Sequence, residues 1–525
     1  MSEEAGSVKL KKAKLPLVLA IDVGTSSTRA LVYDANGRPV RKLACQVGYA
    51  LTTTPEGGAY VDSKLIVEST FACIDRVVEE MGRKADAIQG VGLDTFWHNV
   101  LGVDSRGRPT TAAITWADTR PRLVIPSLRS RLDADDVHAR TGCVLHPSYL
   151  PAKLLWLHET DRAAFDATVT WMSVGEYLYY VLFGKALCGV SMASGTGLFN
   201  QNEGSWDARV LDALPVTPDK LSELGDLDTP LRGLRRTYAE RWPALAKVPW
   251  YPAVGDGASS NVGTGCLDKS QLCIVMGTSG ALRACWKAKQ VAIPRGLWVY
   301  RVDKRRFLMG GALSDGGNLR KWLVAQLGIA GGKKGVDTAL VAGKPDGHGL
   351  SVLPFWAGER STGWHEKARG LIAGLNLSTT PQDLVQAAIE GLCYRYAAIH
   401  EIIKRQGLSV RQIVASGGGF IDSAMLTQLM SDVLGEPITQ SGEAEGSARG
   451  TAVLALEAMG AIRDASEAPI PLGRTFEPNM QRHEIYERAR ERQKALYDLV
   501  SQGWWSVEDA PPPAQASRRR TKHFK

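Results

Sequence analysis

The chain has 525 residues, of which 44% are hydrophobic and 22% are charged. These fractions are close to the globular average and exclude a mostly disordered, collagen-like or coiled-coil chain. The net charge of +8 is concentrated at the ends, because residues 1–14 and 506–525 carry +2 and +3 of it. A nucleic-acid-binding protein would carry its basic residues on a folded face, so we expect no nucleic-acid partner and two disordered basic tails.

The eight cysteines are scattered and contain no CxxC pair, so the sequence predicts neither a disulfide framework nor a zinc site. The apolar run at 15–21 is too short for a signal peptide, and no stretch approaches the ~20 apolar residues of a membrane-spanning helix. We therefore expect a cytoplasmic protein without a membrane partner. The sequence is compatible with a homodimer.

The first half of the chain opens with a buried strand at 15–21, a Gly-Thr-Ser turn and a second strand. An Asp-x-Asn-Gly hairpin then leads to a third strand. A helix is predicted over 62–82 and a strand over 87–94, followed by a hairpin at 104–107. From 147 to about 183 the pattern is helical, with Lys153, Trp156 and Glu159 on a 3–4 spacing.

This opening pattern occurs a second time. GTSSTRA at 24–30 aligns with GTSGALRA at 277–284, and each lies at the head of a predicted β-meander. A chance match of two glycine turns is the alternative, but the shared position favours an internal structural repeat. We therefore predict an N-terminal lobe at 15–262 and a C-terminal lobe at 263–505, with the boundary inside 258–270.

The C-terminal lobe is predicted to alternate strands and helices. A hairpin at 303–306 follows the second Gly-Thr-Ser turn, and a later strand begins at 412. Helices are predicted over 316–327, 381–406, 423–434, 447–459 and 483–500.

No GxxxxGK[ST] loop is present, so a nucleotide site would have to be built from other turns. Exposed backbone N–H groups in two Gly-Thr-Ser turns, one per lobe, could form an anion-binding concavity. Asp22 precedes the first turn and could hold Mg²⁺ through water. A glycine cluster at 416–423 follows a strand and opens a helix, where a ribose or a flat ring could approach the backbone. Plain structural turns remain the alternative for each.

Asp256 stands between Gly255 and Gly257 at the predicted lobe boundary. A positioned carboxylate that accepts a hydroxyl proton is what phosphoryl transfer to an alcohol requires. Capping of the following helix is the structural alternative. Asp256 is thus the candidate general base.

The chain resembles the FGGY family of carbohydrate kinases from about 17 to 459. KLLWLHE at 153–159 resembles the first family signature, and GLIAGL at 370–375 with Asp383 and Glu390 resembles the second. Leu150 departs from the first signature, which usually has a small or hydroxyl residue there. The resemblance implies an α/β fold of two actin-like, ribonuclease H-like lobes around a central cleft, in which ATP and a sugar meet.

The resemblance also implies roles at matching positions. Asp256 falls on the catalytic base. The phosphate-binding positions are Thr25, Ser26, Ser27, Arg29, Gly277 and Thr278, and the adenosine positions are Gly317, Lys321, Gly418 and Ser423. The substrate positions are Trp97, His98, Asp118, Arg120 and Asp256, and the metal position is Asp22, with ATP and Mg²⁺ as the expected cofactors.

Similarity to the gluconate-specific members of the family makes D-gluconate the expected substrate and 6-phospho-D-gluconate the product. Kinases for ketopentoses such as xylulose and ribulose remain the alternative, whereas glycerol kinases place Arg-Glu where Trp97 and His98 stand. Arg120 and His98 are the expected partners of the gluconate carboxylate. An actin-like ATPase needs no polyol pocket, and a sugar sensor without catalysis needs neither Asp22 nor Asp256.

Overall fold

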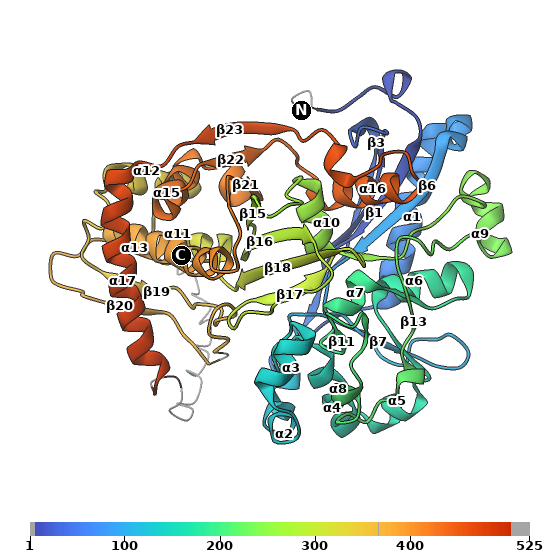
Figure 1. The fold of residues 1–525 in the computed structure, drawn as a ribbon, viewed down its shortest axis with the longest axis horizontal. Helices are drawn as coiled ribbons and strands as arrows, with labels where there is room; N and C mark the ends of the chain where they lie inside the picture. The colour runs from blue at the N-terminus through green and yellow to red at the C-terminus, as the bar shows by residue number, and fades with distance from the viewer. Residues whose placement is uncertain (1–5, 366, 504, 506–525) are drawn as a thin grey trace, which may run out of the picture.

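Two mixed β-sheets organise the computed structural model, which describes residues 6–365, 367–503 and 505 (Figure 1). The first sheet has the order β14-β6-β1-β2-β3 and the second the order β17-β18-β16-β15-β21-β22-β23. The first contains β1 (Leu17–Val23), β2 (Ser27–Tyr33), β3 (Pro39–Gly48), β6 (Ile88–Thr95) and β14 (Val254–Gly255). The second contains β15 (Gln271–Met276), β16 (Gly280–Lys287), β17 (Trp298–Arg301), β18 (Arg306–Leu313), β21 (Gln412–Ser416), β22 (Ile438–Ser441) and β23 (Leu472–Phe476).

The two sheets share one topology. In the first, β1 runs antiparallel to β2 and β2 to β3, whereas β1 runs parallel to β6 and β6 to β14. In the second, β15 and β16 and then β16 and β18 are antiparallel, whereas β15 and β21 and then β21 and β22 are parallel. Each sheet begins with a hairpin closed by a Gly-Thr-Ser turn, so the predicted α/β class and internal repeat are confirmed.

Helix α16 (Gly446–Ala458) comes from near the C-terminus but covers the first sheet, beside β1 and β6 (Figure 1). Its alanines pack against Val18 and Ala20 of β1 in one buried cluster. It also crosses α10 (Asp256–Gly263) backbone to backbone. A Cβ atom at Gly450 would lie 1.8 Å from the carbonyl oxygen of Ser259, so only glycine permits this approach. The position of α10, and of Asp256 at its start, therefore depends on α16.

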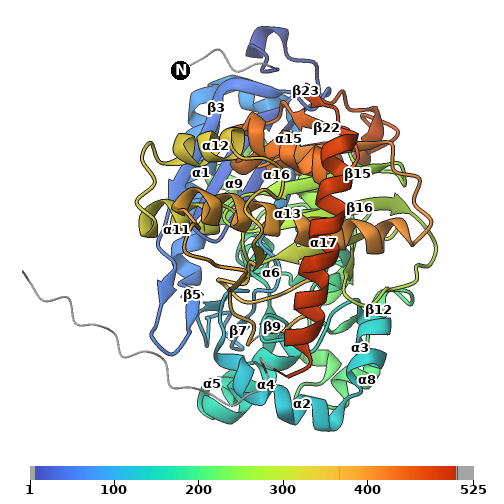
Figure 2. The same cartoon turned by 90° about the vertical axis from the view of Figure 1, so that its left-hand side faces the viewer.

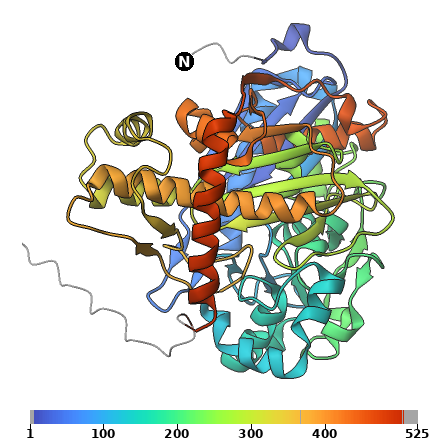
Figure 3. The same cartoon turned by 60° about the vertical axis from the view of Figure 1, so that its left-hand side comes forward.

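Helices surround the second sheet. The buried α13 (Pro381–Lys404) begins with a capping box between Thr380 and Asp383, and α17 (Met480–Ser501) packs across it (Figures 2 and 3). The others include α11 (Gly317–Gln326), α12 (Lys333–Ala342), α14 (Gly418–Ile421) and α15 (Ala424–Leu434). The predicted helices of this lobe and α1 (Ser63–Met81) are confirmed, with ends displaced by a turn at most.

The predicted helical segment at 147–183 is confirmed only in part, because it is divided into three helices and a strand. The segment contains α4 (Leu150–Thr160), α5 (Arg162–Ala167), β9 (Thr170–Met172) and α6 (Val174–Phe183). Asp161 caps the start of α5, Ser173 opens α6 with a capping box, and β9 pairs with β7 (Leu101–Val103). Side-chain caps and a distant partner strand thus interrupt a pattern whose apolar spacing alone predicts helix.

The segment 6–14 differs from the predicted disordered tail. Val8 is buried, its N–H donates to the carbonyl oxygen of Pro39 (3.0 Å), and its own carbonyl accepts from the N–H of Arg41 (2.9 Å). This segment therefore lies along β3. The predicted tail at 506–525 lies outside the described residues. Among the helices of the described part of the chain, none is long and apolar enough to cross a membrane.

The contact between α10 and α16 generates a stability prediction. Gly450→Ala should lower the free energy of unfolding by about 1–3 kcal/mol, because the added methyl overpacks two helix backbones. Gly446→Ala in the same helix is the matched control, since its Cβ would lie 3.9 Å from the nearest atom. Urea unfolding measures both variants. Equal stability of Gly450→Ala and Gly446→Ala would contradict the backbone contact.

Candidate active site

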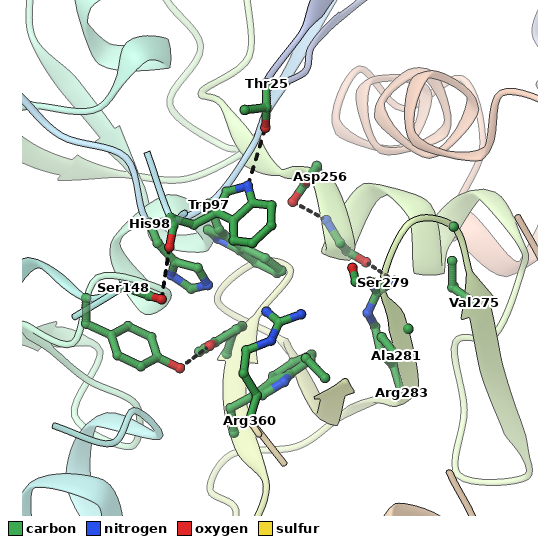
Figure 4. A pocket seen from close by; sticks show the side chains of 18 of the residues that line it. Thr25, Trp97, His98, Ser148, Asp256, Val275, Ser279, Ala281, Arg283 and Arg360 are labelled. Carbon is green, nitrogen blue, oxygen red and sulfur yellow. Dashed lines mark hydrogen bonds between the residues drawn. The ribbon is translucent and has the colours of Figure 1, made fainter. Parts of the chain in front are cut away.

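A cavity of about 310 Å³ lies between the two lobes (Figure 4). Residues of both lobes line it, and both Gly-Thr-Ser turns contribute. The predicted site residues that line it are Thr25, Trp97, His98, Asp256 and Gly277. The structure therefore brings together the candidate base, part of the predicted substrate site and one residue from each predicted phosphate-binding turn.

The indole ring of Trp97 forms one wall of this cavity and packs against glycine backbone. A Cβ at Gly255 would lie 1.9 Å from Cε2 of the ring, and a Cβ at Gly257 would lie 2.8 Å from Cζ3. The ring N–H donates to the carbonyl oxygen of Ser191 at 3.0 Å. The two glycines beside Asp256 are thus required by the close approach of Trp97.

Asp256 is the first residue of α10 and faces the cavity (Figure 4). Gly255 occupies the N-cap position, and Oδ1 of Asp256 accepts the N–H of Gly257 at 2.7 Å. Asp256 is therefore not the N-cap residue of α10, and its carboxylate contacts the N–H of the next residue only locally. Burial raises the pKa of Asp256 above its ordinary value, while the charge of Arg283 acts in the opposite direction. A carboxylate with a raised pKa is a stronger proton acceptor.

His98 presents a hydrogen-bond acceptor to the cavity. Its Nδ1 lies 2.6 Å from the carbonyl oxygen of Gly195, which can only accept, so Nδ1 carries the proton and Nε2 the lone pair. Burial lowers the pKa of His98 to about 3, and the ring is neutral at pH 7. Its backbone is left-handed, with φ 60°, and the ammonium group of Lys153 donates to its carbonyl oxygen.

Three carboxylates gather at the carboxyl ends of neighbouring strands. Asp22 on β1 and Asp94 on β6 are register partners, and both interact electrostatically with Asp256. Burial raises the pKa of Asp22 to about 6 and that of Asp94 well above its ordinary value. Carboxylate oxygens are ligands that Mg²⁺ prefers, and a cation would relieve their mutual repulsion. The chemistry of Asp22 and Asp94 suits Mg²⁺, and Asp22 stays the predicted metal residue.

The predicted phosphate-binding positions lie on or beside the two turns. Ser26, Gly277 and Thr278 are exposed, Thr25 lies on the cavity, and Ser27 closes the first turn by accepting the N–H of Gly24 at 2.9 Å.

Arg29, on β2, is already engaged by acidic groups. Its guanidinium lies 2.6 Å from Glu445 and 3.7 Å from Asp22. A phosphate group at this position would therefore compete with Glu445 for the arginine.

The predicted adenosine positions are only partly adjacent to the turns. Gly317 opens α11, and its N–H donates to the carbonyl oxygen of Gly277 at 2.9 Å. Lys321 and Gly418 are exposed. The hydroxyl of Ser423 caps the N-terminus of α15 and donates to Asp337 at 2.6 Å, so these contacts already engage the predicted adenosine residue.

Asp118 and Arg120 are predicted substrate residues that do not line the cavity. Their side chains form an ion pair of 2.6 Å, and Asp118 also accepts the N–H of Ala59 at 3.0 Å. The guanidinium of Arg120 lies 4.5 Å from the ring centroid of Trp156. Their charges compensate each other, so Arg120 is not free to neutralise an anion in the cavity.

Other residues that line the cavity were not predicted. Arg360 lies in the segment FWAGERS, and Arg283 lies in the second Gly-Thr-Ser repeat, GTSGALRA; neither side chain was among the predicted site residues. Tyr149 and Tyr300 join them, with their hydroxyls 2.7 Å apart. Nothing in the local sequence indicates that these side chains face one cavity, because they come from separate elements.

Lys153 generates a prediction about stability and pH. The side chain is fully buried, and burial lowers its pKa from 10.5 to about 7. Between these values the unfolded chain binds more protons than the folded one, so this residue makes the unfolding free energy rise with pH, by at most about 1.4 kcal/mol per unit. Lys153→Met should remove that slope between about pH 7 and pH 9, as measured by urea unfolding. The exposed control Lys64→Met should keep it, and an unchanged slope in Lys153→Met would contradict the assignment.

Comparison with known proteins places these features in a family. Residues 17–263 match the N-terminal domain model of the FGGY family of carbohydrate kinases, and residues 272–459 match its C-terminal domain model. The gluconokinase of Bacillus subtilis (strain 168) is 27% identical over 87% of this chain and 91% of that protein. The glycerol kinase of Geobacter sp. (strain M21) is 28% identical over 93% and 99%, and the xylulose kinase of Staphylococcus xylosus is 24% identical over 92% and 99%.

A solved structure gives the same fold. The gluconate kinase from Lactobacillus acidophilus superimposes with a TM-score of 0.88 at 24% identity, covering 94% of this chain and 99% of that one. The two repeated sheets around a cleft are thus the two actin-like, ribonuclease H-like lobes expected from the sequence. Both family models match, one in each half, and together they span most of the chain, which therefore belongs to the FGGY family of carbohydrate kinases.

Proposed function

We propose that this carbohydrate kinase transfers the γ-phosphoryl group of ATP to a hydroxyl group of a sugar acid, with D-gluconate as substrate and 6-phospho-D-gluconate as product. The observation that carries the proposal is the cavity, in which the carboxylate of Asp256 faces a neutral histidine acceptor and two arginines. It lies beside both Gly-Thr-Ser turns. The arrangement suits an anionic, hydroxyl-rich acceptor close to a nucleotide phosphate.

In the proposed reaction, Asp256 accepts the proton of the substrate hydroxyl while its oxygen forms a bond to the γ-phosphorus. The bond between the γ-phosphorus and the bridging oxygen breaks, and ADP leaves. Nε2 of His98 accepts a hydrogen bond from another hydroxyl and orients the acceptor. Positioning and electrostatic stabilisation supply most of the rate, as in phosphoryl transfer generally.

The phosphates would be held by the two turns, with Thr25, Ser26 and Ser27 on one side and Gly277 and Thr278 on the other. Exposed N–H groups and hydroxyls in such turns donate to phosphate oxygens. Asp22 would hold Mg²⁺, which supplies charge neutralisation to the phosphates when bound.

Gluconate is favoured over neutral sugars by the charges of the cavity. Asp256 is the one carboxylate among the described residues that line it, whereas Arg283 and Arg360 are cationic. The similarity to a gluconokinase agrees with this choice, but identities of 24–28% extend equally to glycerol and xylulose kinases. A ketopentose kinase is therefore the second candidate. A panel of aldonates, ketoses and polyols, with ADP release as the readout, separates them.

Replacement of the candidate base is the direct test of mechanism. Asp256→Asn should lower kcat by about two to four orders of magnitude, because the shape remains but the proton acceptor is lost. Nucleotide binding and the unfolding midpoint should stay close to those of the wild type. Activity within a few-fold of the wild type would show that Asp256 is not the base.

The electrostatics of Asp256 predict a pH effect. Because burial raises its pKa, the acid limb of the kcat/KM profile should lie at higher pH than an ordinary aspartate would give. Arg283→Met removes the cation that opposes this shift, so the acid limb should move further toward neutral pH. The profile is measured at saturating Mg²⁺. An acid limb that stays in place, or moves to lower pH, would contradict the assignment.

A further inference from the structure

We propose that Arg360 is the specificity-determining residue that binds the carboxylate of the sugar acid, in place of the sequence-predicted Arg120. This inference rests on the proposed function and names the group that would select an acid over a neutral sugar.

Arg360 lacks the acidic partner that a partly buried arginine normally has. Among the described residues no carboxylate lies within ion-pair distance, and the guanidinium of Arg360 donates a hydrogen bond to the carbonyl oxygen of Leu313 at 3.2 Å. Its guanidinium carbon lies 5.7 Å from the ring centroid of Trp116. A buried arginine usually pairs with an anion, so an unpaired one on a substrate cavity indicates that the substrate supplies the anion.

The groups around Arg360 do not compensate its charge. Those that interact with it electrostatically are the phenols of Tyr149 and Tyr300 and the cationic Arg283. Arg360 in turn acts on the two neutral histidines His98 and His146, whose pKa values burial lowers to about 3. The guanidinium lies in the middle of the cavity, between His98 and Arg283 (Figure 4).

The neighbours of Arg360 hold its backbone in place. Ser361 exchanges two hydrogen bonds with Ala312 of β18, at 2.9 and 3.0 Å. Glu359 forms an ion pair with Arg395 of α13 (2.7 Å). Its carboxylate also accepts a hydrogen bond from the hydroxyl of Tyr497 on α17 (2.9 Å). Pre-positioning of this kind reduces the entropy lost when a ligand binds.

Two other arginines near the site differ from Arg360 in what they contact. Arg120 is neutralised by Asp118 and lies outside the cavity lining. Arg283 also has no carboxylate within ion-pair distance among the described residues, but its charge acts on Asp256 and it donates to the carbonyl oxygen of Gly257 at 3.4 Å, so it lies at the end of the cavity with the candidate base. Arg360 is therefore the cation available for the carboxylate at the end of the acceptor remote from the reacting hydroxyl.

The test compares D-gluconate with D-gluconamide, which has the same hydroxyls but a neutral amide in place of the carboxylate. The wild type should prefer gluconate by about 10- to 100-fold in kcat/KM, the usual range for a charge-assisted hydrogen bond. Arg360→Met should reduce this preference to nearly nothing, mainly through KM for gluconate, and Arg360→Lys should restore part of it. Calorimetric titration with gluconate alone gives a readout independent of turnover.

Matched variants separate Arg360 from its neighbours. Arg283→Met and Arg120→Met should keep the preference for gluconate even where they lower activity on both acceptors. The exposed Arg122→Met is the surface control and should match the wild type. Unfolding midpoints verify each fold, and Arg360→Gln replaces Arg360→Met if the latter is unstable.

Three results would overturn the proposal. The first is a preference for gluconate that survives in Arg360→Met, or that Arg283→Met or Arg120→Met removes instead. The second is an equal loss on both acceptors with a raised KM for ATP, which would place Arg360 on the transferred phosphoryl group. The third is turnover of neutral ketoses without aldonates, which leaves the kinase activity standing. Absence of turnover with every acceptor would instead contradict the proposed function itself.

Discussion

The packing of the Trp97 indole against glycine backbone is the contact on which the geometry of the site depends. The ring follows β6 and meets Gly195, Gly255 and Gly257, each at a distance that no Cβ atom could share. The last two flank Asp256, so the ring determines how closely α10 approaches the sheet. The interlocked backbones of α10 and α16 hold the opposite side of that helix. The candidate base Asp256 is therefore positioned by the close packing of α10 against Trp97 and against α16 rather than by its own hydrogen bonds.

The same ring connects the two lobes. Tyr300 of β17 lies 4.9 Å from Trp97 between ring centroids, and its hydroxyl bonds to that of Tyr149 from the first lobe. Backbone of β17 adds further links, because the carbonyl of Arg301 accepts from Ser191 at 2.9 Å. Aromatic side chains give a large contact area with little conformational freedom, which suits a wall shared by two lobes. The base and the acceptor-binding groups thus belong to one packed unit.

Charge pairing decides which cations of the site can act on a ligand. Arg29, Arg120 and Arg395 all have carboxylate partners within 2.7 Å, and their charges are compensated inside the protein. Arg360 has none among the described residues, a feature that it shares with Arg283 on the same cavity. Lys153 differs from these arginines, because burial lowers its pKa. Its side-chain nitrogen donates to the carbonyl oxygen of His98, whose backbone is left-handed.

The sequence by itself determined the repeated hairpins and the principal helices, because strand ends and glycine turns are local features of the chain. The grouping of Thr25, Trp97, His98, Asp256 and Gly277 followed from the resemblance to the FGGY family, and the cavity brings these residues together. The sequence did not determine the interruption of 147–183, which depends on β9 finding its partner β7. Nor could it show that Asp118 neutralises Arg120 while Arg360 remains unpaired. Ion pairing and close backbone approach are contacts between segments distant in sequence, so only the tertiary structure decided which charges remain free to meet a substrate.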